Sequence, residues 1–124
     1  MTIAAPAYVY TAEVLRWVDG DTVDLCVDVG FHMTFEGRFR LYGVDTPERG
    51  QPNHDEAWLL AATVAPVGAK VLARTLKSAD KYGRWLAEIL TADGTKSVGE
   101  SLLENKLAVP YFGGHKGEVT PAAA

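Results

Sequence analysis

Short strand-like segments, each ended by a turn residue, constrain the fold of this chain more than any other feature of its sequence. The clearest segment runs from Thr22 to Val29, where apolar and polar residues alternate. In an extended strand Val23, Leu25 and Val27 then share one face, and Gly30 marks the following turn. This alternation predicts a sheet with one buried face.

Four further segments have the composition of strands and are bounded by glycine, proline or aspartate. They span residues 8–17, 33–44, 69–76 and 84–90. The pair Glu36-Gly37 interrupts the second of them, and Asp93-Gly94 marks a turn after the last. The sequence therefore predicts five short strands that are linked by turns or loops.

Two helices are expected beside these strands. Residues 53–64 have helical spacing, with Asn53 as a cap and with Pro66 and Gly68 ending the helix, and residues 98–106 form a shorter one. Five strands with a helix after the third are typical of a small Greek-key barrel of the oligonucleotide/oligosaccharide-binding kind, the OB-fold. The predicted fold is thus mainly β with α.

The length of 124 residues fits one domain, and 48% apolar residues suffice for a core. We expect an N-terminal arm at 1–7, a domain at 8–112 and a flexible tail at 113–124. There is no apolar run long enough for a membrane span and no convincing signal peptide. A monomeric, cytoplasmic protein is expected, and secretion is not excluded.

The charge balance limits how this chain contacts nucleic acid. It has 12 Lys and Arg against 16 Asp and Glu, which gives a net charge of −4. A protein that coats nucleic acid through a broad surface is normally basic. Any contact with phosphate is therefore expected to be local.

Four short strings carry residues suited to such a local site. They are VDGDTV at 18–23, FRL at 39–41, VDTPE at 44–48 and DKYGR at 80–84. Carboxylate oxygens hold Ca²⁺ or Mg²⁺, and guanidinium groups grip phosphate oxygens in pairs. No single string is specific, but their order in a small β-rich chain points to a hard metal ion facing a phosphodiester.

The strand pattern also predicts where some of these side chains point. Asp21 shares a face with Asp19 at one end of the inward row, where a buried acid needs a cation or hydrogen-bond donors. Strict alternation puts Arg40 and Asp45 on opposite faces. A shared site then requires a twist or bulge, and Gly43 is the position for it.

Each charged residue also has a plainer interpretation when taken alone. Asp19 belongs to a hairpin turn, Asp45 caps a strand end, Glu48 is a solvated loop residue, Arg40 points outward and Arg84 lies at the rim. The three histidines, His32, His54 and His115, show no zinc spacing and are interpreted as surface or loop residues. Trp58 and Trp85 are interpreted as core residues.

The motifs VDGDTV, FRLYGVDTPE and DKYGRWLA, and more loosely SVGESLLENKLA, resemble those of the staphylococcal nuclease (thermonuclease) family from about Tyr8 to Phe112. The resemblance implies a five-stranded barrel and a Ca²⁺-dependent phosphodiesterase that cleaves DNA and RNA, endo- or exonucleolytically, to products with 3′-phosphates. Mg²⁺ or Mn²⁺ would be weaker substitutes for Ca²⁺.

The resemblance also assigns the metal-binding residues. It implies that Asp21 and Asp45 bind the metal ion together with the backbone carbonyl of Thr46. It places Asp19 near the ion as an acid that acts through water. These residues lie in the first and third of the four strings.

The remaining roles are catalytic or concern the substrate. The family's general base falls on Glu48, its two phosphate-binding arginines fall on Arg40 and Arg84, and its phosphate-contacting tyrosine falls on Tyr82. Lys81 and Tyr111 are further candidates for contact with the substrate. The expected partners are single-stranded or frayed DNA and RNA.

A competing hypothesis is a non-catalytic module of the same fold that binds nucleic acid or a protein partner. Such domains typically lack the acids or the arginines of the motifs, and this chain has both. A cleavage assay distinguishes the two hypotheses.

Overall fold

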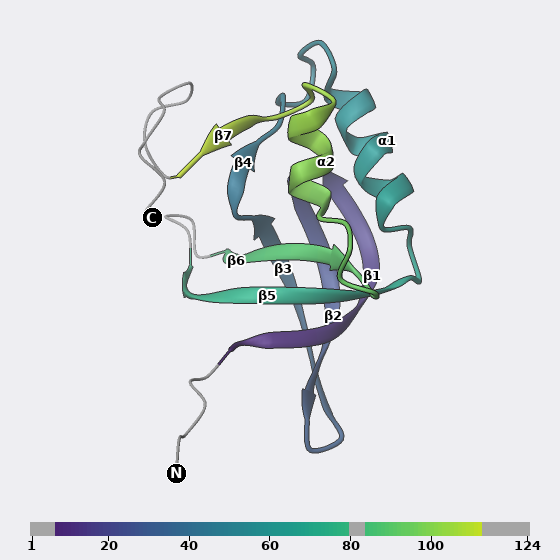
Figure 1. Ribbon diagram of the computed structural model, residues 1–124, viewed down its shortest axis with the longest axis vertical. Helices are drawn as coiled ribbons and strands as arrows, with labels where there is room; N and C mark the ends of the chain where they lie inside the picture. The colour runs from purple at the N-terminus through teal and green to yellow at the C-terminus, as the bar shows by residue number, and fades with distance from the viewer. Residues whose placement is uncertain (1–6, 80–83, 113–124) are drawn as a thin grey trace.

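The computed structural model describes residues 7–79 and 84–112 (Figure 1). Five strands close into a barrel in the order β1-β2-β3-β6-β5. They are β1 (Val9–Asp19), β2 (Thr22–Gly30), β3 (Met33–Leu41), β5 (Lys70–Ala79) and β6 (Trp85–Thr91). Strands β3 and β6 pair in parallel and the other neighbours are antiparallel. The predicted OB-fold-like barrel is confirmed.

Two short strands and two helices lie outside the barrel. Strand β4 (Gly43–Asp45) pairs with β7 (Val109–Tyr111), and the helices are α1 (His54–Val64) and α2 (Val98–Glu104). Both helices lie at the same end of the barrel (Figure 1). The predicted break at Glu36-Gly37 was wrong, because β3 runs through it and ends at Leu41. Strand β7 was not predicted, since a three-residue segment carries little pattern.

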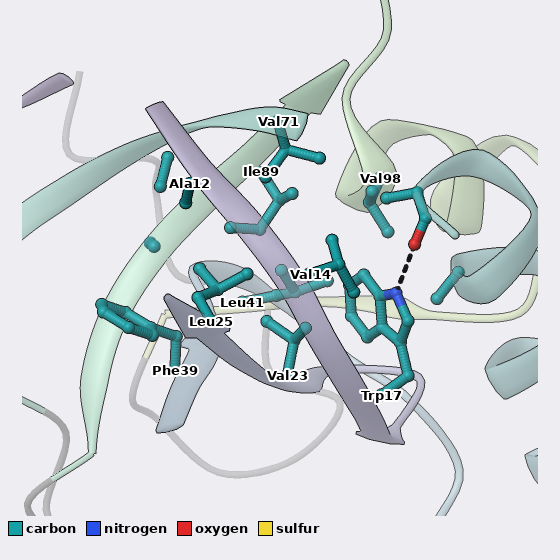
Figure 2. Close-up of a cluster of buried hydrophobic side chains, with 14 of the residues drawn as sticks. Ala12, Val14, Trp17, Val23, Leu25, Phe39, Leu41, Val71, Ile89 and Val98 are labelled. Atoms are coloured by element: carbon teal, nitrogen blue, oxygen red, sulfur yellow. Dashed lines mark hydrogen bonds between the residues drawn. The ribbon is translucent and has the colours of Figure 1, made fainter. Parts of the chain in front are cut away.

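The core fills the barrel and continues under the helices (Figure 2). Val23, Leu25 and Val27 are buried, as their alternation predicts. Trp17 closes the end of the barrel that faces α1, and its indole N–H donates to the carbonyl of Ala65 at 2.8 Å, the dashed line in Figure 2. This buried hydrogen bond satisfies the one polar atom of the tryptophan side chain.

Helix α1 begins and ends where the sequence predicts, but its start has a different geometry. Asn53 takes a left-handed conformation with φ 69°, and its side chain makes no capping hydrogen bond. Asn53 is therefore the N-cap residue, as predicted, but it caps the helix only through its backbone carbonyl, which accepts from the amide of Ala57. Asp55 and Glu56 occupy the first turn, where acids favour the helix dipole. At the start of α2, Ser97 Oγ accepts a hydrogen bond from the amide of Glu100.

Two tryptophans that were predicted to lie in the core are partly exposed. Trp58 on α1 is 40% exposed and Trp85 on β6 is 42% exposed. The indole N–H of Trp58 donates to the carbonyl of Trp17. Both side chains thus present part of an aromatic surface to solvent.

The hairpin of β2 and β3 extends beyond the other strands of the barrel (Figure 1). Its turn places Phe31 and His32 in the left-handed region, each at φ 58°. Phe31 is 94% exposed at the tip. Within the described residues, neither helix is both long and apolar enough to cross a membrane.

Candidate active site

The turn between β1 and β2 brings an aspartate under helix α1. Gly20 in this turn is buried, and a Cβ there would lie 2.9 Å from the Cβ of Ala57. Any side chain at Gly20 would push α1 away from the barrel. The carbonyl of Asp21 accepts a hydrogen bond from the amide of Leu41 at 2.8 Å, which fixes the turn to the end of β3.

Asp21 is 8% exposed, and hydrogen bonds satisfy both of its carboxylate oxygens. Oδ1 accepts from the hydroxyl of Thr22 at 3.1 Å, and Oδ2 accepts from the backbone amide of Thr46 at 3.0 Å. The hydroxyl of Thr46 is buried and makes no hydrogen bond with any described residue. Asp21 thus ties the first motif to the third across 25 residues.

Arg40 lies at the centre of the site and is also 8% exposed. Its Nη1 donates to the carbonyl of Val44 at 2.8 Å and to that of Leu41 at 3.3 Å. The same nitrogen lies 3.3 Å from Oδ2 of Asp21, and Nη2 lies 3.0 Å from Oδ1 of Asp45. The guanidinium therefore joins two carboxylates while the backbone fixes its plane.

A bend after β3 makes this arrangement possible. Gly43 has a φ of +84°, a conformation that residues with a Cβ rarely adopt. The bend lies where the sequence placed it. Because of it, Asp45 turns back toward Arg40 instead of pointing to the opposite face.

The charges of this cluster do not cancel. Asp21 and Asp45 carry two negative charges and Arg40 one positive charge, which leaves one excess negative charge in a largely buried group. Oxygen donors with excess negative charge are what a hard cation prefers, so the residues fit the implied Ca²⁺. Among residues 7–79 and 84–112, no three Asp, Glu, His or Cys side chains cluster as metal ligands, so carbonyls and water would have to complete the set.

The ion pairs of Asp19 join it to His54 and Arg49 and not to Arg40. Its Oδ1 lies 2.9 Å from Nε2 of His54 and 4.0 Å from Nη2 of Arg49. Nδ1 of His54 lies 3.1 Å from Oδ1 of Asp55. The hydrogen bonds to Asp19 first and to Asp55 second raise the pKa of His54 above its ordinary value.

The interpretation of His54 as a surface or loop residue was wrong, because it is only 9% exposed. The spacing of the helix contained the signal. His54, Ala57 and Ala61 are the buried residues of α1, and positions three and seven apart share a helix face. Sequence reasoning missed it because a histidine without metal spacing resembles any polar residue.

Glu48 lies in the loop after β4 and is exposed. Its backbone amide donates to the side-chain oxygen of Gln51 at 2.9 Å, and its carbonyl accepts from the amide of Gln51, also at 2.9 Å. This reciprocal pair holds the loop in a turn. The carboxylate of Glu48 remains accessible to water.

Strand pairing brings the backbone of Arg84 close to that of Arg40. Arg40 pairs with Leu86 across the parallel β3–β6 ladder, and Arg84 precedes Leu86 by two residues. Side chains two residues apart in an extended segment share a face about 7 Å apart. Arg84 is half-buried and directly precedes β6, so an extended backbone there would put its side chain on the face of Leu86.

The candidates for substrate contact are only partly described. The ring of Tyr111 on β7 lies beside Arg40, whose Cζ is 5.8 Å from the ring centre. Lys81 and Tyr82 lie outside the described residues. The structure thus brings Asp21, Asp45, Arg40, Thr46 and Tyr111 together, and places Asp19 with His54 beside them.

The closed five-stranded barrel places the protein in the OB-fold class. The chain belongs to the staphylococcal nuclease homologue family, whose model matches residues 38–120, more than half of the chain. The match includes the second, third and fourth motifs. It confirms the resemblance to staphylococcal nuclease.

A curated relative is the "Probable endonuclease LCL3" of Yarrowia lipolytica (strain CLIB 122 / E 150). It is 40% identical over 84 residues, which cover 60% of this chain and 35% of the relative. The aligned part of this chain spans about a third of the relative's length.

Proposed function

We propose that the protein is a metal-dependent phosphodiesterase that hydrolyses DNA and RNA. The observation that carries the proposal is Arg40, which is buried, fixed by two carbonyls and joined to Asp21 and Asp45. A guanidinium held this rigidly pays no further cost of ordering when it meets a phosphate. Membership of the nuclease family and the name of the relative support a nuclease.

The proposed metal is Ca²⁺, held by Asp21, Asp45 and the carbonyl of Thr46, with Asp19 acting through water. Ca²⁺ takes about six to eight oxygens, so these residues leave positions for water and for a phosphate oxygen. When bound, the ion would act as a Lewis acid on the phosphate and as a template for the substrate. Mg²⁺ or Mn²⁺ are expected to substitute weakly, because Mg²⁺ prefers shorter bonds and a stricter geometry.

The side chains have separate roles in this proposal. Arg40 and Arg84 bind the phosphoryl oxygens and stabilise the charge that grows on them in the transition state. Glu48 is accessible to water and orients the attacking water molecule or removes its proton. Water attacks the phosphorus and the P–O5′ bond breaks. The 5′-oxygen takes up a proton and leaves as a hydroxyl, so the phosphate stays on the 3′-oxygen of the preceding nucleotide.

A short, flexible strand is the expected substrate. The chain has a net charge of −4, and Arg40 is surrounded by acids rather than by other cations. A long basic groove for duplex DNA is therefore not expected. Single strands and frayed ends can bend one phosphate toward the arginines, and we propose a monomer as the active form.

The test is a cleavage assay on single- and double-stranded DNA and RNA, with Ca²⁺ and with EDTA. The proposal expects cleavage of single strands in Ca²⁺, 3′-phosphate ends on the products and no cleavage in EDTA. Glu48→Gln is expected to stay folded and to lose turnover. Binding without cleavage in Ca²⁺ would instead support the non-catalytic module.

A further inference from the structure

Helix α1 packs against the end of β1 and the turn that follows it, and a buried histidine lies at this contact (Figure 1). Gly20 in the turn fits closely against Ala57 of the helix. Asp19 contacts the ring of His54, which precedes Ala57 by three residues and shares its helix face. The helix therefore packs directly on the turn that provides Asp19 and Asp21.

His54 is held on both sides of its ring and at its backbone. Its Nε2 lies 2.9 Å from Oδ1 of Asp19, and its Nδ1 lies 3.1 Å from Oδ1 of Asp55. An ionised carboxylate only accepts hydrogen bonds, so each ring nitrogen donates to its own aspartate. The backbone amide of His54 donates to the carbonyl of Gln51 at 3.3 Å. The loop that carries Glu48 thus ends at the same fixed residue.

The two carboxylate oxygens of Asp19 differ in their surroundings. Oδ1 faces Nε2 of His54 and lies 4.0 Å from Nη2 of Arg49. Within residues 7–79 and 84–112, no hydrogen bond or ion pair involves Oδ2. The side chain is 34% exposed, so water reaches the carboxylate. One oxygen of Asp19 is therefore anchored and the other is open.

We propose that His54 is a positioning residue of the active site, which holds Asp19 by one oxygen and leaves the other free for water of the bound cation. This inference rests on the proposed function, in which Asp19 acts on Ca²⁺ through water. Hydrogen-bond partners outside the direct ligands orient a metal site. Losing one of them typically costs about 10- to 100-fold in metal affinity or activity.

Anchoring Asp19 from a helix has a physical advantage. A partly exposed aspartate on a turn samples several rotamers, and selecting one of them when a cation binds costs entropy. His54 is buried and belongs to a helix, so its ring has little freedom. The hydrogen bond fixes the acid before a cation arrives, which is preorganisation. Arg49 is a poor anchor by comparison, because its side chain is 78% exposed.

Three neutral substitutions separate the hydrogen bond to Asp19 from the charge of the ring. The amide nitrogen of glutamine lies about as far from the backbone as Nε2 of histidine, so His54→Gln can still donate to Asp19. Asparagine reaches only as far as Nδ1, so His54→Asn keeps a donor toward Asp55 and loses the one to Asp19. His54→Leu donates to neither. His32→Leu is the control, because His32 is exposed at the hairpin tip.

The experiment measures Ca²⁺ affinity from the rise of the melting temperature as CaCl₂ is added. Each variant is compared with its own melting temperature in EDTA, so a loss of stability that is unrelated to the cation cancels. His54→Gln should bind Ca²⁺ roughly 10- to 100-fold more tightly than His54→Asn and His54→Leu. His32→Leu should match the unsubstituted protein. Should His54→Leu fail to fold, His54→Asn gives the answer.

A second comparison tests whether His54 acts through Asp19. Combined with Asp19→Ala, the three substitutions should give equal Ca²⁺ affinities, because the carboxylate that only His54→Gln holds is absent. A difference that persists there would assign the effect to the packing of α1 and overturn the proposal.

Two further outcomes separate this proposal from the proposed function. If the unsubstituted protein cleaves DNA in Ca²⁺ and the three single variants bind Ca²⁺ equally, His54 does not position Asp19 and the phosphodiesterase stands. If the unsubstituted protein shows neither a rise of its melting temperature with CaCl₂ nor cleavage, the proposed function itself is contradicted, and this inference with it.

Discussion

Two arginine–aspartate clusters are built around Arg38 and Arg40, two residues apart on β3, and they differ in exposure and in charge balance. On the outer face, Asp24 accepts hydrogen bonds from Arg38 and Arg16. At the end of the barrel, Arg40 joins Asp21 and Asp45. The side chain of Arg38 is 46% exposed and that of Arg40 is 9% exposed.

The two clusters also have opposite charge balances. The outer cluster has two arginines for one acid, and the hydrogen bond from Arg38 lowers the pKa of Asp24 below its ordinary value. The inner cluster has two acids for one arginine. Water screens the excess charge of the outer cluster, whereas the inner cluster is largely shielded from water. Pairing alone therefore does not distinguish the two clusters, whereas burial and charge balance do.

The largest expected difference concerns stability. Arg40→Ala would leave Asp21 and Asp45 without their shared cation, and removing one partner of a buried ion pair costs about 3–5 kcal/mol. Arg38→Ala removes an exposed partner, and exposed pairs are worth about 0–1 kcal/mol. Chemical unfolding in EDTA measures both. Similar losses for the two variants would mean that the inner cluster is as well solvated as the outer one.

The second difference concerns turnover. Arg40→Lys keeps the charge but loses the planar fork, and we expect turnover to fall by about 10²-fold or more, as when one transition-state donor is removed. Arg38→Lys is the matched control and should retain turnover. Both variants should show the circular dichroism spectrum of the unsubstituted protein. Near-normal turnover of a folded Arg40→Lys would exclude a catalytic role for this arginine.

The sequence predicts features that depend on neighbouring residues, but not contacts between residues that are far apart in the chain. Alternation located β2 and its buried face, and the need for a bend located Gly43, because both are local properties. The pairing of Asp19 with His54 spans 35 residues, and no local pattern predicts it. Trp85 forms the first pair of the β3–β6 ladder with Phe39, and no local pattern predicts that pairing. Trp58 and Trp85 were misplaced because large aromatic residues are usually buried.

The third difference concerns salt. Each phosphate contact adds about −0.9 to the slope of log affinity against log salt concentration on duplex DNA, and about −0.7 on a single strand. If only Arg40, Arg84 and one neighbouring cation meet the nucleic acid, the footprint is two or three phosphates and the slope should be roughly −1.5 to −3. A salt titration of oligonucleotide binding by Glu48→Gln in Ca²⁺ measures it. A slope steeper than about −5 would mean that Arg38, Arg16 and other outer cations form an extended binding surface.

The smallest expected effect is a dependence of stability on pH near the inner cluster. Asp19 and Asp55 raise the pKa of His54, so the folded protein holds that proton more tightly than the unfolded chain does. The stabilisation from this tighter proton binding is fully present below the pKa of about 6.5 that a histidine has in the unfolded chain. It is lost as the pH rises through the higher pKa of His54 in the folded protein. The outer cluster contributes nothing in this window, because Asp24 titrates far below it.

The measurement is the free energy of unfolding in EDTA at a series of pH values from about 5.5 to 8.5. The unsubstituted protein should become less stable with rising pH, and the stability of His54→Gln should change less over the same range. His32→Gln is the control, because His32 lies exposed at the hairpin tip. If His54→Gln showed the same pH profile as the unsubstituted protein, the pair of His54 with Asp19 would contribute no charge-dependent stability. In that case His54 would support Asp19 only through packing and a neutral hydrogen bond.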